Sequence, residues 1–192
     1  MSEENQVPVW SGQKQVVMDT LKRTGRYVSK REYVEQKYQD TAWCFKQAYQ
    51  FLVEKGRERV PMPEGAEYPI WVYGQKHHIF PDYDMTCLKL EVPESELLLF
   101  DTRKWNKILN LDYLSLDQSD EMEFGQWLKQ RGINQCLDIF RTPYYPIEKK
   151  KIMESWNRLF DDNIKDAAYV QGTVWEIKRE WICEEYKYGG AK

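Results

Sequence analysis

The residues with the clearest capacity for chemistry are the two histidines, His77 and His78. Because they are adjacent, an extended strand would direct them to opposite faces. One imidazole with the carboxylates of Asp82 and Asp84 could coordinate a metal ion, but such a set in a loop commonly arises by chance, and a metal site has strict geometric and second-shell requirements. The four cysteines are too far apart to form a zinc ligand pair, at Cys44, Cys87, Cys136 and Cys183. We therefore predict that the chain holds no metal.

Motifs for phosphate binding and covalent catalysis are absent from the sequence. Neither G-x-G-x-x-G nor G-x-x-x-x-G-K-[ST] occurs, which argues against nucleotide binding through those loops. No serine or cysteine lies in a recognisable nucleophile elbow, and a triad would have to recruit one of only two histidines. On this basis we expect no cofactor.

Two segments place polar side chains beside apolar runs. Residues 101–110 (DTRKWNKILN) follow an apolar strand, and residues 171–176 (QGTVWE) lie on an alternating one. A capped helix anchored by Trp105 also explains the first segment, and a strand with a solvated polar face explains the second. If both segments instead face one cleft, their indole and amide groups would hold a planar, polar ligand. The candidate ligand-binding residues are Trp10, Trp71, Asp82, Asp101, Trp105, Asn110, Gln171 and Trp175.

Helical periodicity predicts the elements that would carry part of this set. Apolar residues spaced by three and four predict helices over 14–24 and 30–55. A loop rich in proline and glycine follows the second helix. Capping residues and a proline suited to a first turn predict three further helices, which begin at Asp101 or Thr102, at Asp120 and at Pro146.

Alternating and apolar runs predict the strands. They cover residues 7–10, 68–73, 85–92, 97–100 and 169–177. The polar stretch 74–84 suggests a hairpin connection, and the apolar run 97–100 suggests a central strand. Residues 181–188 fit either a strand or a helical tail. Because helices and strands do not alternate one for one, we predict an α+β fold with a mixed or largely antiparallel sheet and helices packed around it.

Length and composition are those of a globular chain. The 192 residues, 42% hydrophobic and 31% charged, predict a single domain over 1–192. The net charge of −3 argues against a nucleic-acid partner. Without a signal peptide or membrane span, we expect a cytoplasmic protein with reduced thiols. The 8 Trp, 13 Tyr and 7 Phe can build a core, or some of them can line a cleft and stack on a flat ligand.

A series of residues spread along the chain resembles a known family. The series is Trp10, Pro69-Ile70-Trp71, Pro81-Asp82, Asp101 with Trp105 and Leu109-Asn110, Trp156 with Phe160, and Gln171 with Trp175. This pattern resembles a bacterial domain-of-unknown-function family, family 3841, over nearly the whole chain. The resemblance implies the extent of the domain but no activity.

The order of elements is also similar to that of the ADP-ribosyltransferase fold, in which a split sheet clamps NAD. This similarity implies NAD as the cofactor, with Glu176 stabilising an oxocarbenium-like transition state and Trp71 or Trp175 stacking on nicotinamide. Trp10 and Ser11 stand where such enzymes carry His or Arg. On a regular strand Glu176 would also point away from Trp175.

Two functional hypotheses follow. The first is a non-catalytic domain with an aromatic-lined cleft, which binds a protein partner or a small planar ligand. The second is an ADP-ribosyltransferase-like enzyme that uses NAD. The lack of a catalytic motif favours the first. The substitution Glu176→Gln separates them, because it should abolish turnover only under the second.

Overall fold

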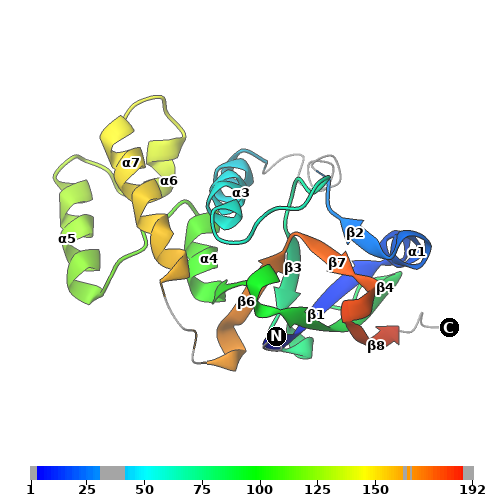
Figure 1. Ribbon diagram of the computed structural model, residues 1–192. Helices are drawn as coiled ribbons and strands as arrows, with labels where there is room; N and C mark the ends of the chain where they lie inside the picture. The colour runs from blue at the N-terminus through cyan, green and yellow to red at the C-terminus, as the bar shows by residue number, and fades with distance from the viewer. Residues whose placement is uncertain (1–3, 31–41, 162–163, 165, 188–192) are drawn as a thin grey trace.

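The computed structural model describes residues 4–30, 42–161, 164 and 166–187, and it has the predicted α+β fold (Figure 1). The strands are β1 (Gln6–Lys14), β2 (Arg26–Val28), β3 (Ile70–Tyr73), β4 (Met85–Pro93), β5 (Leu98–Asp101), β6 (Val170–Val174), β7 (Glu176–Lys178) and β8 (Ile182–Lys187). Six of them form an antiparallel sheet in the order β5-β6-β3-β1-β4-β8. The other two, β2 and β7, form a separate antiparallel pair.

The helices gather mainly at one end of the molecule. They are α1 (Gln15–Thr24), α3 (Ala42–Arg57), α4 (Thr102–Leu109), α5 (Gln118–Lys129), α6 (Cys136–Phe140) and α7 (Pro146–Ser155). Figure 1 shows α3 to α7 together at one end, with α1 beside β2 at the other. Part of the helix predicted over 30–55 is α3, while residues 31–41 lie outside the described part of the chain.

One apolar core lies between α1 and the sheet. Val17 and Leu21, four residues apart on α1, are both buried and belong to the same cluster as Leu88 and Leu90 of β4. The alternation predicted for β4 is thus confirmed, since its even-numbered apolar residues face this core. Gly25 ends α1 with φ of 76°, a conformation that glycine adopts without a steric penalty.

A second core joins the helical end to the other part of the sheet. Leu52 of α3, Trp105 of α4, Ile152 of α7 and Trp156 just after α7 are nearly or fully buried there, together with Phe100 of β5. The three- and four-residue spacings predicted for these helices therefore describe the faces that they bury.

The prediction of a hairpin at residues 74–84 is wrong. Strand β1 lies between β3 and β4 and pairs with both, so the connection crosses over β1 instead of joining neighbours. An alternating pattern indicates which side of a strand is apolar, but it carries no information about the partner strand.

The central position predicted for residues 97–100 is also wrong, because β5 is an edge strand that pairs only with β6 in the sheet. Its apolar character has another cause. Leu98 and Phe100 belong to the helical core, whereas Leu99 packs against the core under α1. A strand between two cores is apolar on both faces even at an edge.

The predicted helix starts are confirmed at two of three places. Asp101 caps α4 by accepting a hydrogen bond from the Arg103 amide at 2.8 Å, and Pro146 occupies the first turn of α7. Helix α5 instead begins after Asp117, which accepts from the Asp120 amide at 2.9 Å. The choice between a strand and a helical tail at residues 181–188 is also settled, since Ile182–Lys187 form strand β8.

Candidate functional site

Strands β1 and β3 are paired at one pair of residues only and move apart beyond it. Their register joins Trp10 to Tyr73, whereas all nine residues of β1 pair with β4. Side chains bridge the opening: the Ser11 hydroxyl donates to the Trp71 carbonyl at 2.7 Å, and the Gln13 amide donates to the Ser11 hydroxyl at 2.7 Å. The sheet therefore opens between these two strands without a continuous backbone ladder.

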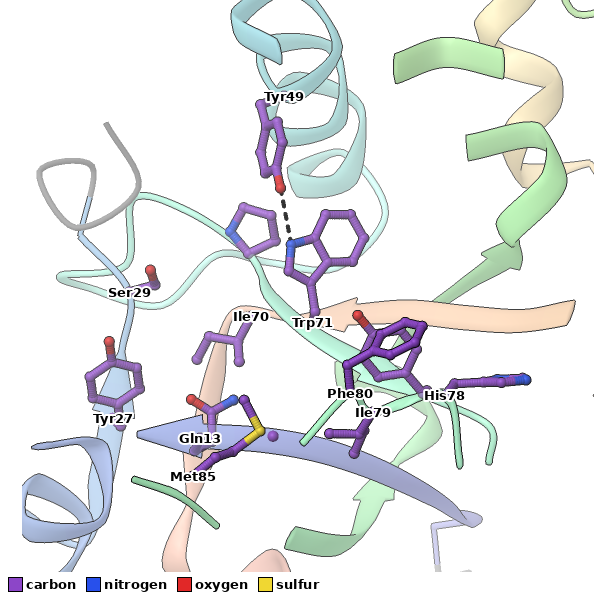
Figure 2. A pocket seen from close by; sticks show the side chains of 13 residues that line it. Gln13, Tyr27, Ser29, Tyr49, Ile70, Trp71, His78, Ile79, Phe80 and Met85 are labelled. Carbon is purple, nitrogen blue, oxygen red and sulfur yellow. Dashed lines mark hydrogen bonds between the residues drawn. The ribbon is translucent and has the colours of Figure 1, made fainter. Parts of the chain in front are cut away.

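A cavity of about 340 Å³ lies at this opening, and we call it the β1–β3 cavity (Figure 2). Its walls come from β1, β2, β3, α3, the connection 74–84 and the first residue of β4. The volume is within the range of small-molecule pockets. The aromatic rings that line it are those of Tyr27, Tyr49, Trp71, Tyr73, His78 and Phe80.

Neighbouring rings hold the indole of Trp71 in place. Its Nε1 donates a hydrogen bond to the Tyr49 hydroxyl at 3.1 Å, as Figure 2 shows. The rings of Tyr49 and Trp71 meet edge-on at 89°, and the Trp105 ring lies 5.3 Å from that of Trp71. Because these contacts already fix the indole, ligand binding would cost little of its conformational entropy.

The side chains around the cavity are mostly polar without being charged. Burial and, secondarily, repulsion from His77 lower the pKa of His78, which favours the neutral imidazole, a form that can both donate and accept a hydrogen bond. Gln13 and Ser29 also line the cavity. Among the described residues, the lining includes no Lys, Arg, Asp or Glu. The arrangement suits a ligand with flat apolar faces and a few hydrogen-bonding groups at its edge.

Three of the predicted ligand-binding residues lie on or near this part of the sheet. Trp71 lines the cavity. Trp10 is half-buried on β1 outside the lining, with its ring 5.8 Å from that of Tyr186 on β8. Asp82 is exposed on the connection 74–84 and forms an ion pair with Lys14 at 2.5 Å.

The other five predicted residues lie in structural positions outside the cavity lining, three of them on or next to α4. Asp101 caps α4 and pairs with Arg103, whose hydrogen bonds lower the pKa of its carboxyl group. Trp105 is 2% exposed in the helical core, as the capped-helix interpretation predicts. Asn110 donates to the Asn106 carbonyl at the end of α4.

Strand β6 and the residue that follows it, Trp175, are buried on both faces. Gln171 accepts a hydrogen bond from the Thr102 hydroxyl at 2.7 Å, and Thr173 is 2% exposed, so the interpretation of a solvated polar face is wrong. Trp175 donates its Nε1–H to the Val60 carbonyl at 2.8 Å within the helical core. Gln171 and Thr173 lie opposite Phe100 and Leu98 of the neighbouring strand β5.

Glu176 lies on β7, opposite Val28 of β2. Its side chain is 7% exposed, and its oxygens are 2.9 Å from Arg26 Nε and 3.5 Å from Lys178 Nζ. The Arg26 contact has the distance of an ion pair but not the direction of a hydrogen bond, so one carboxylate oxygen, Oε2, is buried without a hydrogen-bond donor. Glu176 does not line the β1–β3 cavity, although Tyr27 and Ser29 on the adjoining strand do.

Several lining residues escaped the sequence analysis. Tyr49 belongs to the apolar stripe of a predicted helix, and Phe80 lies in a stretch predicted to be a loop. Neither residue type nor spacing predicts that Tyr27 and Ser29 line the same cavity as Trp71. Their position depends on the pairing of β2 with β7, and that of Tyr49 depends on α3 crossing β3. The only signal in the sequence is the density of aromatic residues.

The cysteines provide a test of burial. Burial raises the pKa of the Cys136 thiol to about 11, and Cys87 is fully buried, whereas Cys183 is exposed. Since the thiolate is the reactive form, we expect iodoacetamide at mildly alkaline pH to label Cys183 first. Cys87 and Cys136 should react only after denaturation. Peptide mapping by mass spectrometry checks this order, and equal labelling of the three in the folded protein would contradict it.

The described residues contain no group of three or more His, Cys, Asp or Glu side chains arranged to hold a metal ion. No helix in the described ranges has both the length and the apolar character needed to cross a membrane. A search of curated proteins finds no match to this chain, and a search of solved structures also finds none. The family described as domain of unknown function DUF3841 matches residues 8–183, which include all the residues that line the β1–β3 cavity. This match confirms the family resemblance, and the chain belongs to the DUF3841 family.

Proposed function

We propose that this protein is a non-catalytic binding domain that takes a neutral, planar small molecule into the β1–β3 cavity. The observation that supports this proposal most strongly is the position of the Trp71 indole. It is immobilised at the cavity wall, and its only ring N–H already donates to Tyr49. Such an indole offers a ligand its flat face and no further hydrogen bond. His78, Gln13 and Ser29 would form hydrogen bonds with polar groups at the edge of the ligand.

The absence of charged residues from the described lining supports a neutral ligand. A phosphate or carboxylate removed from water would need a cationic partner to offset its desolvation. A heteroaromatic base has two apolar faces and an edge of donors and acceptors, which matches the neutral polar groups around the rings. We therefore expect nucleobases and nicotinamide to bind better than their phosphorylated derivatives.

A second candidate function is an NAD-dependent transferase with Glu176 as its catalytic carboxylate. It is favoured by the buried oxygen of Glu176 that lacks a hydrogen-bond donor, because such a group is costly to bury and a catalytic role is one reason for a protein to keep it. The ion pairs of Glu176 with Arg26 and Lys178 count against it, since they provide a structural reason for the charge. Under this alternative, NAD would be the cofactor and Glu176→Gln would abolish turnover.

We place either function in the bacterial cytoplasm as part of the same proposal. The support is the resemblance to a bacterial family and the free thiols of Cys87, Cys136 and Cys183.

Thermal unfolding with adenine, nicotinamide and NAD tests the proposal. A ligand at about 100 times its dissociation constant stabilises a protein by roughly 2.7 kcal/mol, which raises the midpoint by several degrees in a chain of this size. We expect adenine or nicotinamide to produce such a shift. A shift with NAD alone would favour the transferase, and no shift with any of the three would contradict both functions.

Phe80 allows binding to be separated from folding. It lines the cavity yet is 85% exposed, so Phe80→Ala should leave the midpoint of the free protein unchanged. An aromatic contact contributes about 0.5–1.5 kcal/mol, and we expect roughly 3- to 10-fold weaker binding by calorimetry. Tyr83→Ala is the matched control, since Tyr83 is equally exposed on the same connection but does not line the cavity. Equal effects of the two substitutions would argue against binding at this site.

A further inference from the structure

A second cavity, of about 500 Å³, lies at the helical end of the molecule. It is bounded by the end of α4, the segment 110–113, one face of α5 and the segment 134–137. No residue lines both this cavity and the β1–β3 cavity. We call it the α4–α5 cavity.

The carboxylate of Asp112 is the distinctive group of the α4–α5 cavity. Asp112 is half-buried and lines the cavity, and no described residue forms a side-chain hydrogen bond or ion pair with it. Burial raises the pKa of Asp112 despite the opposing influence of Lys107. Lys107 is itself paired with Glu121 at 3.0 Å, and both residues line the cavity. The carboxylate therefore lacks the partner that a partly desolvated charge requires.

The backbone holds Asp112 firmly at this position. The preceding residue, Leu111, is fully buried and has φ of 57°, a left-handed conformation that is unfavourable for leucine. The Asp112 amide donates to the Lys107 carbonyl at 2.9 Å, and the Asp112 carbonyl accepts from Trp156 Nε1 at 2.8 Å. Both backbone groups are thus engaged, and the carboxylate remains available to the cavity.

The remainder of the α4–α5 cavity is apolar with amide groups. The ring of Phe124 stacks on that of Tyr113 with centroids 3.9 Å apart, and Leu128 also lines the wall. Asn134 and Gln135 offer carbonyl oxygens near one side. A ligand would thus meet one unpaired carboxylate, the ion pair of Lys107 with Glu121, amide groups and an apolar surface.

We propose that the α4–α5 cavity binds a small organic cation, in which an ammonium or amidinium group pairs with Asp112 and an apolar body packs on the Phe124 side. The charged residues that line the cavity are Lys107, Asp112 and Glu121. Since Lys107 and Glu121 neutralise each other, the unbalanced charge is that of Asp112, and it selects a cation over an anion. This site does not depend on the function proposed for the β1–β3 cavity.

Isothermal titration calorimetry with phenylethylammonium and benzamidinium tests the proposal, with 2-phenylethanol as the neutral analogue. We expect both cations to bind the full chain, and the alcohol to bind at least about tenfold more weakly, because charge-assisted hydrogen bonds are stronger than neutral ones. Asp112→Asn keeps the side-chain shape and should weaken binding of the cations at least about tenfold. Asp138→Asn is the control, because Asp138 is an exposed aspartate of α6 outside the lining.

A second variant tests the cavity without changing Asp112, in case Asp112→Asn affects folding. Gly125 lines the cavity from α5, and a Cβ placed on it would meet no atom within 4 Å. Gly125→Leu should fill this space and abolish cation binding while α5 remains folded. Phe80→Ala should leave cation binding unchanged, which distinguishes the two cavities. The proposal is overturned if neither cation binds, if the alcohol binds equally well, or if Asp112→Asn and Gly125→Leu both bind like the parent protein.

Discussion

Replacing Trp156 with alanine should lower the free energy of unfolding by about 3–5 kcal/mol, the usual cost of removing a buried indole. Trp156 is 0% exposed, and its ring lies 5.5 Å from that of Phe51 and 6.1 Å from that of Phe140. These contacts join α3, α6 and the turn after α7. The substitution would leave a cavity where three elements meet, and well-packed surroundings close such cavities only in part.

The indole nitrogen of Trp156 adds a polar contribution. Its N–H donates to the Asp112 carbonyl at 2.8 Å, so truncation also leaves that carbonyl without this donor. Trp156→Phe keeps a ring but removes the N–H, and it should cost less than the alanine substitution. Urea unfolding followed by circular dichroism measures both changes. An alanine variant within about 1 kcal/mol of the parent would show that this region relaxes freely, contrary to the packing described here.

Replacing Gly172 with alanine should destabilise the protein by about 1–3 kcal/mol or more, because the added methyl group has no space. A Cβ at Gly172 would lie 2.5 Å from the Leu98 carbonyl oxygen and 2.7 Å from Leu99 Cδ2. The first of these atoms belongs to the backbone of β5, which pairs with β6 at this point. Relief of the contact would require the two strands to separate, with loss of their hydrogen bonds.

Gly125 provides the matched control for Gly172. It lies within α5, where an added Cβ would meet open space. Alanine has a higher helix propensity than glycine by about 1 kcal/mol, so Gly125→Ala should leave stability unchanged or increase it. Thermal unfolding of the two variants side by side checks the contrast. A Gly172→Ala variant as stable as Gly125→Ala would mean that β5 can shift without cost.

Local patterns were sufficient for most of the elements. The apolar spacing of α1, the alternation of β4, the Asp101 cap and Pro146 at the start of α7 all depend on neighbours within one or two turns of the chain. The start of α5 was misplaced because Asp117 and Asp120 both have the chemistry of a cap. The carboxylate of Asp120 accepts instead from the Tyr113 hydroxyl and the Leu116 amide.

The candidate sites were much less predictable than the elements. Trp71 was identified from the sequence, but Tyr49 and Tyr27, which face the same cavity, come from other elements tens of residues away. Asp112 carried no signal, because an aspartate after a helix is ordinary in a loop. Its significance arises from the buried Leu111 before it and from Trp156, which is 44 residues away in the chain.

By itself, the sequence determined the α+β class, the positions of most helices and strands, and the aromatic character of the core, since these follow from residue type and short-range periodicity. Only the tertiary structure decided that β1 lies between β3 and β4, and that β5 is an edge strand between two cores. It also decided which rings and carboxylates meet at the two cavities. Strand order and cavity shape arise from contacts between distant segments, and a pattern that repeats every two to four residues contains no record of such contacts.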